Sequence, residues 1–269
     1  VTFGTVGTGG FATRNSGLTE FTSTQQTIVT VFMILSGINF GVYYLMLCRK
    51  FKQVLESEEV KYYLAILFGA IAIITINVLE VFQSIPEAIH HSAFQVASIM
   101  TTTGFATVNY DLWPAETKTI LVLLMFIGAC SGSTGGGIKV SRILILLKTV
   151  KKELASQIHP RSIKKIKIEQ HVLDHEVLRS VNVFFAAFML ITAISIFLIS
   201  FDNFDFTTNF TAVAATINNI GPGLSMVGPA ANFAEFSAFS KFVLMFDMLV
   251  GRLEVFPMLL LFAPGTWRK

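Results

Sequence analysis

Charged residues are scarce in this sequence, and their scarcity excludes an ordinary soluble domain. Asp, Glu, Lys and Arg make up 14% of the 269 residues, whereas soluble domains carry about 25%. Hydrophobic residues account for 53% of the chain, and 26 residues are Phe. We therefore predict an integral membrane protein.

Cysteine and metal-binding patterns are also nearly missing. The two cysteines, Cys48 and Cys130, lie in or beside apolar segments; this excludes a disulfide framework and predicts buried free thiols. The five histidines show no metal-ligand spacing, and the sequence contains no HExxH motif, no Ser/His/Asp pattern and no paired aspartates in an apolar segment. We expect neither an enzyme nor a cofactor, and no nucleic-acid partner.

The start of the sequence lacks an initiator Met, a signal peptide and a charged leader. Its first residues, Val1–Gly4, lead directly into a turn rich in Gly and Thr. We therefore expect that the chain is the C-terminal part of a longer protein.

Five apolar windows are long enough to cross the ~30 Å hydrocarbon core of a bilayer, which takes about 20 helical residues. The windows are Thr27–Leu47, Tyr62–Val81, Thr119–Leu147, Val177–Ile199 and Phe242–Phe262. Two shorter segments, Ile85–Met100 and Phe206–Asn218, are too mixed to span, and each runs into a glycine turn. Irregular backbone at membrane depth needs protein or a watery pore around it, so these segments fit re-entrant half-helices.

Three glycine turns recur before a spanning window. When Gly10 is aligned with Gly104, the following Phe, Ala and Thr coincide, and a third turn contains Gly221. The three glycines lie 94 and 117 residues apart. One such turn would be interpreted as ordinary chain reversal, but three in register, two of them preceded by half-helices, favour a repeated unit that lines a pore.

Backbone carbonyls can replace the water shell of a cation when the chain adopts unusual conformations, which glycine permits. The half-helices would also point their negative C-terminal ends at such a cation. The residues that we expect to bind the ion are Thr8, Gly9, Gly10, Thr102, Thr103, Gly104, Phe105, Asn219, Ile220 and Gly221.

A second cluster of glycines interrupts the third window. The segment contains Gly132, Ser133, Thr134, Gly135, Gly136, Gly137 and Lys139. Each glycine costs about 0.5–1 kcal/mol in a helix relative to Ala, so the helix should unwind here. We interpret the segment as a movable loop that closes or opens the path below the turns; the alternative is a glycine-rich helix contact. A phosphate-binding loop is excluded, because Ile138 precedes the lysine and no Ser or Thr follows it.

One arginine lies within the last window. Arg252 is roughly 15 Å along the helix from Phe242, at 1.5 Å per residue, where a charge is expensive and indicates function. Asp247 and Glu254 are candidate partners, and a structural ion pair is the alternative interpretation.

Basic residues set the orientation. Lysines and arginines crowd the connections after the first and third windows, including the stretch Lys148–Lys167. The positive-inside rule therefore places these connections in the cytoplasm and the glycine turns outside. The stretch could also bind anionic lipids or a cytoplasmic partner.

The motifs together resemble the Trk/Ktr potassium-uptake family, specifically its bacterial TrkH-like membrane subunits. The segments that carry the resemblance run in family order over nearly the whole chain: Thr8–Phe11, Thr101–Ala106, Gly132–Lys139, Asn219–Gly223 and Gly251–Glu254.

The resemblance implies helix–half-helix–helix repeats around a pseudo-fourfold pore, with the first repeat absent from this fragment. Residues 1–60 would hold the filter turn and last helix of repeat two, 61–150 repeat three, 151–176 a basic cytoplasmic linker and 177–269 repeat four. Residues 131–139 match the family's gating loop, and Arg252 matches its pore-facing arginine. The resemblance also implies a homodimer, a cytoplasmic nucleotide-binding regulatory subunit and a place in the bacterial inner membrane.

The sequence thus predicts a pore-forming subunit for the uptake of monovalent cations, with potassium as the expected substrate. A sodium-permeant member of the family stays open, because the first filter segment is absent. A secondary solute carrier and a membrane scaffold or receptor are two competing interpretations. The repeats share one orientation, which argues against a carrier built from inverted halves.

Overall fold

The computed structural model describes residues 1–13, 17–82, 84–159, 165–169 and 171–267. These residues are mostly helical, which confirms the predicted all-α class. The helices are α1 Thr2–Val6, α2 Ser23–Ser36, α3 Phe40–Leu47, α4 Phe51–Glu56, α5 Glu58–Phe82, α6 Ile85–Met100, α7 Ala115–Ile127, α8 Val140–Ile158, α9 His175–Ile199, α10 Phe206–Ile217, α11 Ala238–Leu253, α12 Val255–Phe262 and α13 Pro264–Trp267. Short 3₁₀ segments cover Tyr110–Leu112, Ser200–Asp202 and Ser225–Val227, and β1 (Lys167–Ile168) pairs antiparallel with β2 (His171–Val172).

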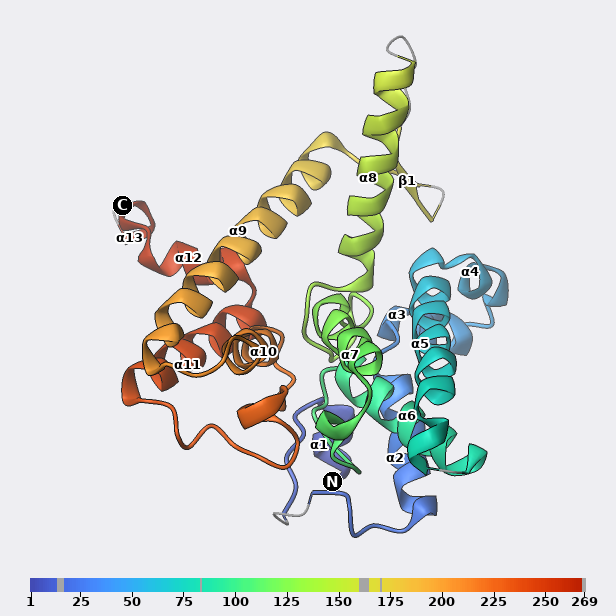
Figure 1. The fold of residues 1–269 in the computed structure, drawn as a ribbon. Coiled ribbons are helices and arrows are strands. Elements are labelled where there is room, and N and C mark those ends of the chain that lie inside the picture. Colours follow the sequence, from blue (N-terminus) through green and yellow to red (C-terminus); the bar gives the residue numbers. More distant parts are fainter. Residues whose placement is uncertain (14–16, 83, 160–164, 170, 268–269) are drawn as a thin grey trace.

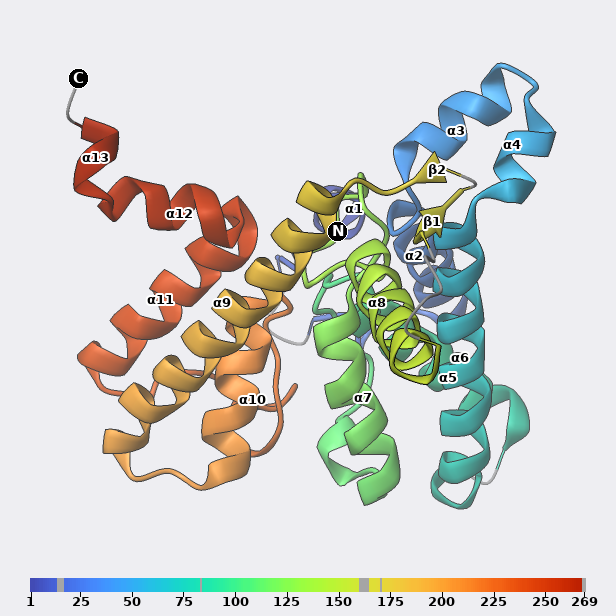
Figure 2. The same ribbon diagram turned by 90° about the horizontal axis from the view of Figure 1, so that it is seen from above.

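The helices form three groups that lie side by side. Figures 1 and 2 show α2 to α6 on one side, α7 and α8 in the middle, and α9 to α12 on the other side. The half-helices α6 and α10 pack inside their groups, α6 against α5 and α2, and α10 against α9 and α11. Helix α8 projects beyond the other helices, and the β1–β2 pair lies beside it (Figure 1).

Helix α5 shows how the apolar pattern places a spanning helix. Its buried residues recur at intervals of three or four and form one face: Glu59, Tyr63, Leu67, Ala70, Ile74 and Val78. That face packs into the main core, while Phe68, Ile73 and Ile76 remain more than half exposed. Large apolar side chains turned outward along a long helix are expected where the surrounding solvent is lipid.

Fewer straight spans form than the sequence predicts. Within the described residues, two helices are long and apolar enough to cross a membrane, Glu58–Phe82 and the run His175–Asp202, and a third is reached if the bent pair α2 and α3 counts as one span. The third predicted window is interrupted, as expected, between α7 and α8.

The prediction of one continuous helix over Thr27–Leu47 is wrong, because α2 and α3 meet at an angle of 90°. Gly37 ends α2 where a Cβ would lie 2.4 Å from the Tyr63 hydroxyl oxygen. Asn39 then starts α3 by accepting a hydrogen bond from the Gly41 N–H at 2.8 Å. The bend frees backbone groups that bond elsewhere, since the Gly37 carbonyl accepts from the Cys130 N–H at 3.0 Å.

The predicted helix over Phe242–Phe262 is also divided. Glu254 separates α11 from α12 and has φ +68°, a left-handed conformation that ends a helix.

The two cysteines differ in exposure: Cys130 is buried as predicted, whereas Cys48, at the C-cap of α3, is exposed. In the predicted basic linker, Arg161 and Lys164 lie outside the described residues.

Candidate functional site

The three glycine turns share one backbone conformation. Thr8, Thr102 and Asn219 all have left-handed φ angles, of +50°, +59° and +57°. Two residues later the glycines also have positive φ: +65° at Gly10, +82° at Gly104 and +107° at Gly221. Left-handed φ is uncommon for residues other than glycine, so its recurrence at matching positions shows that the turns are structurally equivalent.

The turns also share one hydrogen-bond pattern. In each of them two successive N–H groups donate to a single carbonyl in the preceding helix. The N–H groups of Gly9 and Gly10 bond to Gly4 (2.9 and 3.2 Å), those of Thr103 and Gly104 to Ser98 (2.8 and 3.3 Å), and those of Ile220 and Gly221 to Ala215 (2.8 and 3.4 Å). The donors therefore face back into the helix ends.

The turn carbonyls have no such partners. In the part of the chain that the structure describes, no protein hydrogen bond ends on the carbonyls of Thr8, Gly9, Gly10, Thr102, Thr103, Gly104, Asn219, Ile220 and Gly221. Phe105 differs, because its carbonyl accepts from the Ser98 hydroxyl at 2.5 Å and its side chain lies in a core cluster. Thr8, Thr102, Thr103 and Ile220 are buried, whereas Gly9 and Gly221 are exposed. The four buried residues are the unusual ones, since buried backbone groups are nearly always paired.

Backbone contacts order the turns around a common space. A Cβ on Gly10 would lie 2.1 Å from the Thr103 carbonyl oxygen, and one on Gly104 would lie 1.9 Å from that of Ile220. A Cβ on Gly221 would meet nothing within 4 Å. The three turns are thus neighbours in chain order, and residues of all three line a cavity of about 1000 Å³.

Residues 131–139, the segment predicted to act as a gate and called the gate loop below, connect α7 to α8 and lie directly against the turns. The Thr102 hydroxyl accepts the Gly136 N–H at 2.6 Å, and the Thr8 hydroxyl donates to the Thr134 carbonyl at 2.8 Å. A Cβ on Gly136 would lie 2.6 Å from the Asn218 carbonyl oxygen, so only glycine fits. The predicted glycine cluster is therefore an extended loop in contact with all three turns rather than a contact between helices.

Arg252 binds the same loop. Its Nη1 donates to the Thr134 carbonyl at 3.1 Å. Neither candidate partner pairs with it among the described residues, because Asp247 accepts from the Ser195 hydroxyl at 2.7 Å and Glu254 pairs with Arg142. The interpretation of Arg252 as half of a structural ion pair therefore finds no support in the described part of the chain.

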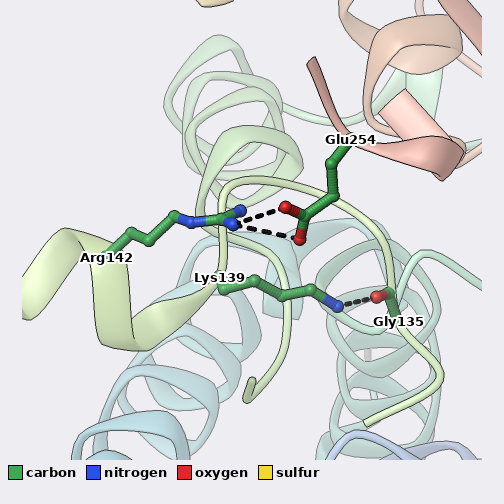
Figure 3. Close-up of polar contacts among 4 residues, drawn as sticks. All are labelled: Gly135, Lys139, Arg142 and Glu254. Carbon is green, nitrogen blue, oxygen red and sulfur yellow. Dashed lines mark hydrogen bonds and ion pairs between the residues drawn. The ribbon is translucent and has the colours of Figure 1, made fainter. Parts of the chain in front are cut away.

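Other charges surround the loop, as Figure 3 shows. The Lys139 ammonium donates to the Gly135 carbonyl within the loop, and Arg142 binds both carboxylate oxygens of Glu254, at 3.0 and 2.9 Å. The Arg142 guanidinium carbon also lies 4.1 Å from the centre of the Phe184 ring. A cavity of about 210 Å³ beside the loop is lined by Lys139, Arg142 and Arg252.

Sequence reasoning gave no site role to two positions, Gly251, which it used only as part of the motif Gly251–Glu254, and Glu59. Gly251 lies where a Cβ would be 1.8 Å from the Ile217 carbonyl oxygen, so α11 packs directly on the end of α10. Glu59 accepts hydrogen bonds from the Ser131 and Ser141 N–H groups, 72 and 82 residues away. The only feature of the sequence that could have drawn attention to Glu59 is that a charged residue stands at the start of a spanning helix. The positive-inside rule takes little account of acidic residues, so it did not single out Glu59.

The fold and the site together define a class: helical membrane proteins in which half-helices end on glycine turns and a broken helix closes over them. The chain belongs to the TrkH family of cation transport proteins, whose model matches residues 1–268.

Individual relatives agree. The chain is 37% identical over 271 residues to the Trk system potassium uptake protein TrkH of Escherichia coli K12 and 34% identical over 268 residues to TrkG of the same strain. It resembles the crystal structure of the potassium transporter TrkH from Vibrio parahaemolyticus, with a TM-score of 0.92 and 34% identity. These matches cover 98–99% of this chain but 56%, 55% and 58% of the three proteins, so the chain spans about half the length of its relatives.

Proposed function

We propose that this chain is part of a pore-forming subunit for the uptake of monovalent cations, with potassium as the substrate. The observation that carries the proposal is the set of nine turn carbonyls that accept no protein hydrogen bond among the described residues. Seven of these residues line one cavity. Relatives named as potassium uptake proteins support the choice of ion. No enzymatic reaction is part of the proposal.

The turns would bind the ion through backbone oxygens. A cation that loses its water shell needs several oxygens at close range, and the three turns supply them without a carboxylate. The half-helices α6 and α10 each end at a turn, as does the five-residue helix α1, so the negative ends of their backbone dipoles point towards the ion. Neutral ligands of this kind favour a weakly held monovalent ion that can leave again.

The gate loop would block the path on the other side of the turns. In this state Thr8, Thr102 and Arg252 hold it through Thr134 and Gly136. Opening requires these hydrogen bonds to break together. Arg252 would also place a positive charge beside the path, which limits how many cations occupy it.

The ring of turns would be completed beside Gly221, where the neighbouring space is open. By this proposal the segments 1–60, 61–150 and 177–269 are successive repeats, 151–176 is a cytoplasmic linker, and one further turn comes from sequence outside this chain. The complete subunit would form a homodimer in the bacterial inner membrane and bind a cytoplasmic nucleotide-binding regulatory subunit.

The test is rubidium uptake into proteoliposomes that contain the complete gene product. We expect potassium to compete strongly and sodium weakly. Gly104→Ser should abolish selective uptake, because the added Cβ meets the Ile220 carbonyl oxygen. Gly69→Ser is the matched control, since a Cβ at Gly69 in α5 meets nothing within 4 Å.

Three further outcomes distinguish the competing functions. Equal competition by sodium would retain the pore and retract potassium as its substrate. Full activity in Gly104→Ser would show that the turns are structural only, as in a scaffold or receptor. Uptake that depends strictly on a second ion would favour a secondary carrier.

A further inference from the structure

Glu59 is a buried carboxylate that joins the two ends of the gate loop. The residue is 6% exposed. Its Oε1 accepts the N–H of Ser131, where the loop begins, at 2.6 Å and the N–H of Ser141, in the first turn of α8, at 3.2 Å. A single oxygen on α5 therefore fixes both ends of a loop whose middle lies against the glycine turns.

The first N–H groups of α8 need a hydrogen-bond acceptor that does not belong to α8 itself. Its N-cap residue, Lys139, has φ +80° and makes no capping hydrogen bond with its side chain. The first N–H groups of a helix lack partners within the helix, and the helix dipole favours a negative charge beside them. The Glu59 carboxylate meets both conditions, which explains how an acidic side chain is tolerated in a buried position.

The two residues before Glu59 bind the linker region. The Ser57 hydroxyl donates to the Glu169 carboxylate, in the turn between β1 and β2, at 2.8 Å. Glu58 pairs with Lys148 of α8, whose ammonium also donates to the Lys167 carbonyl at 2.7 Å. Figures 1 and 2 place the β1–β2 pair next to the start of α5 and beside α8.

We propose that Glu59 is the positioning residue of the gate loop and that the β1–β2 pair acts on the loop through Ser57, Glu58 and Glu59. This inference rests on the proposed function, in which the loop is the gate. Three consecutive residues cannot move independently at the start of a helix. A partner that displaces the β1–β2 pair would therefore shift the Glu59 carboxylate and loosen both loop ends.

The first test compares Glu59→Ala with Glu59→Gln in the complete gene product. Loss of the acceptor should raise basal rubidium uptake about three- to tenfold. This increase lies within the range reported for mutations that weaken the coupling between two sites. The rubidium KM and the potassium preference should not change, because the turns are untouched. Glu59→Gln keeps an acceptor oxygen and should stay within about twofold of wild type. Glu56→Gln, at the exposed end of α4, is the control.

The second test measures coupling. Glu169→Ala should raise uptake in the same direction, and the double variant Glu59→Ala/Glu169→Ala should exceed Glu59→Ala by no more than experimental error. Glu153→Ala, an exposed acidic residue of α8, is the control. Multiplicative effects in the double variant would overturn the proposal, as would a change in KM or ion preference in Glu59→Ala.

A labelling experiment separates this inference from the proposed function. In a Cys48→Ser background, Ser133→Cys on the gate loop should react faster with a water-soluble maleimide when Glu59→Ala is added. Faster labelling without rubidium uptake in wild type would support the coupling and reject the transport function. If the wild type takes up rubidium selectively but Glu59→Ala changes neither uptake nor labelling, the coupling is rejected. If Glu59→Ala does not fold, unchanged uptake and labelling in Glu169→Ala would likewise overturn it.

Discussion

Thr8, Thr102 and Asn219 occupy the same backbone position in the three turns but bond differently. Thr8 and Thr102 each hold the gate loop through a hydroxyl. The Asn219 side-chain nitrogen has no hydrogen-bond partner among the described residues. Two of the three turns therefore carry the hydrogen bonds to the loop, although all three have the same geometry.

Arg252→Ala should raise rubidium uptake about two- to tenfold, the size expected from a modest coupling energy. The substitution removes one hydrogen bond to Thr134 and a positive charge beside the path. A single hydrogen bond contributes about 0.5–1.5 kcal/mol, and the residue is exposed, so the protein should remain folded. Uptake and size-exclusion profiles would be measured together, with Arg179→Ala, on the exposed surface of α9, as the control. A protein that aggregates instead would indicate a structural role.

Among the elements, the sequence predicted the half-helices and the spans α5 and α9 well, but it missed the breaks within the first and last apolar windows. The expected segment Ile85–Met100 coincides with α6, and Phe206–Asn218 is α10 with one residue fewer. Both are short apolar stretches that end at a glycine turn, which is a local signal. The bend between α2 and α3 depends on Tyr63 and on loop backbone around residue 130. Hydropathy measures polarity, so it could not reveal these distant contacts.

Helix α10 starts at a strong cap whose loss can be measured. Asp205 accepts the Thr208 N–H at 3.1 Å and the Thr208 hydroxyl, and these hydrogen bonds lower the pKa of Asp205 below its ordinary value of 3.8. Asp205→Ala should lower the free energy of unfolding by about 0.5–2 kcal/mol. Asp205→Asn, which can still cap the helix, should cost less.

The same cap predicts a pH dependence. A lowered pKa in the folded state means that the stabilisation is present above the ordinary pKa and is lost as pH falls through the folded value. The difference between wild type and Asp205→Ala should therefore be constant near neutral pH and shrink below about pH 4. Thermal unfolding in detergent across this range would measure it, and a difference that grows on acidification would contradict the assignment.

At the scale of the whole molecule, the sequence singled out the segments that the structure brings together at the candidate site, but not how they are held. The turn glycines and the loop glycines were evident because their spacing repeats or their density is unusual. Glu59 and Arg142 bind partners that lie 72 to 112 residues away. Such pairs leave no pattern within a single sequence window. In the described part of the chain Arg252 likewise bonds to the distant Thr134 carbonyl rather than to either candidate partner.

The Arg142–Glu254 pair connects α8 to the break between α11 and α12, and so joins two of the three helix groups. The side chains are 22% and 53% exposed, so solvent screens the pair. A double-mutant cycle with Arg142→Ala and Glu254→Ala should give a coupling of about 0.2–1 kcal/mol that decreases at high salt. Arg179→Ala, on the exposed surface of α9, is the control for loss of charge. A coupling near zero, together with lower stability in Arg142→Ala, would indicate that packing on Phe184 carries the contribution of Arg142 instead.

Under the proposed function, one gate loop in the described chain serves all three turns, which bears on how such a protein could arise. In an oligomer of identical chains, every symmetry-related subunit would carry the same loop, and the copies would compete for the space on the axis. Tandem duplication within one gene removes that constraint, because each copy can then diverge separately. In the described chain only the connection from α7 to α8 has become this loop. Under the proposed function, duplication followed by divergence would thus allow one asymmetric loop to control a nearly symmetric passage.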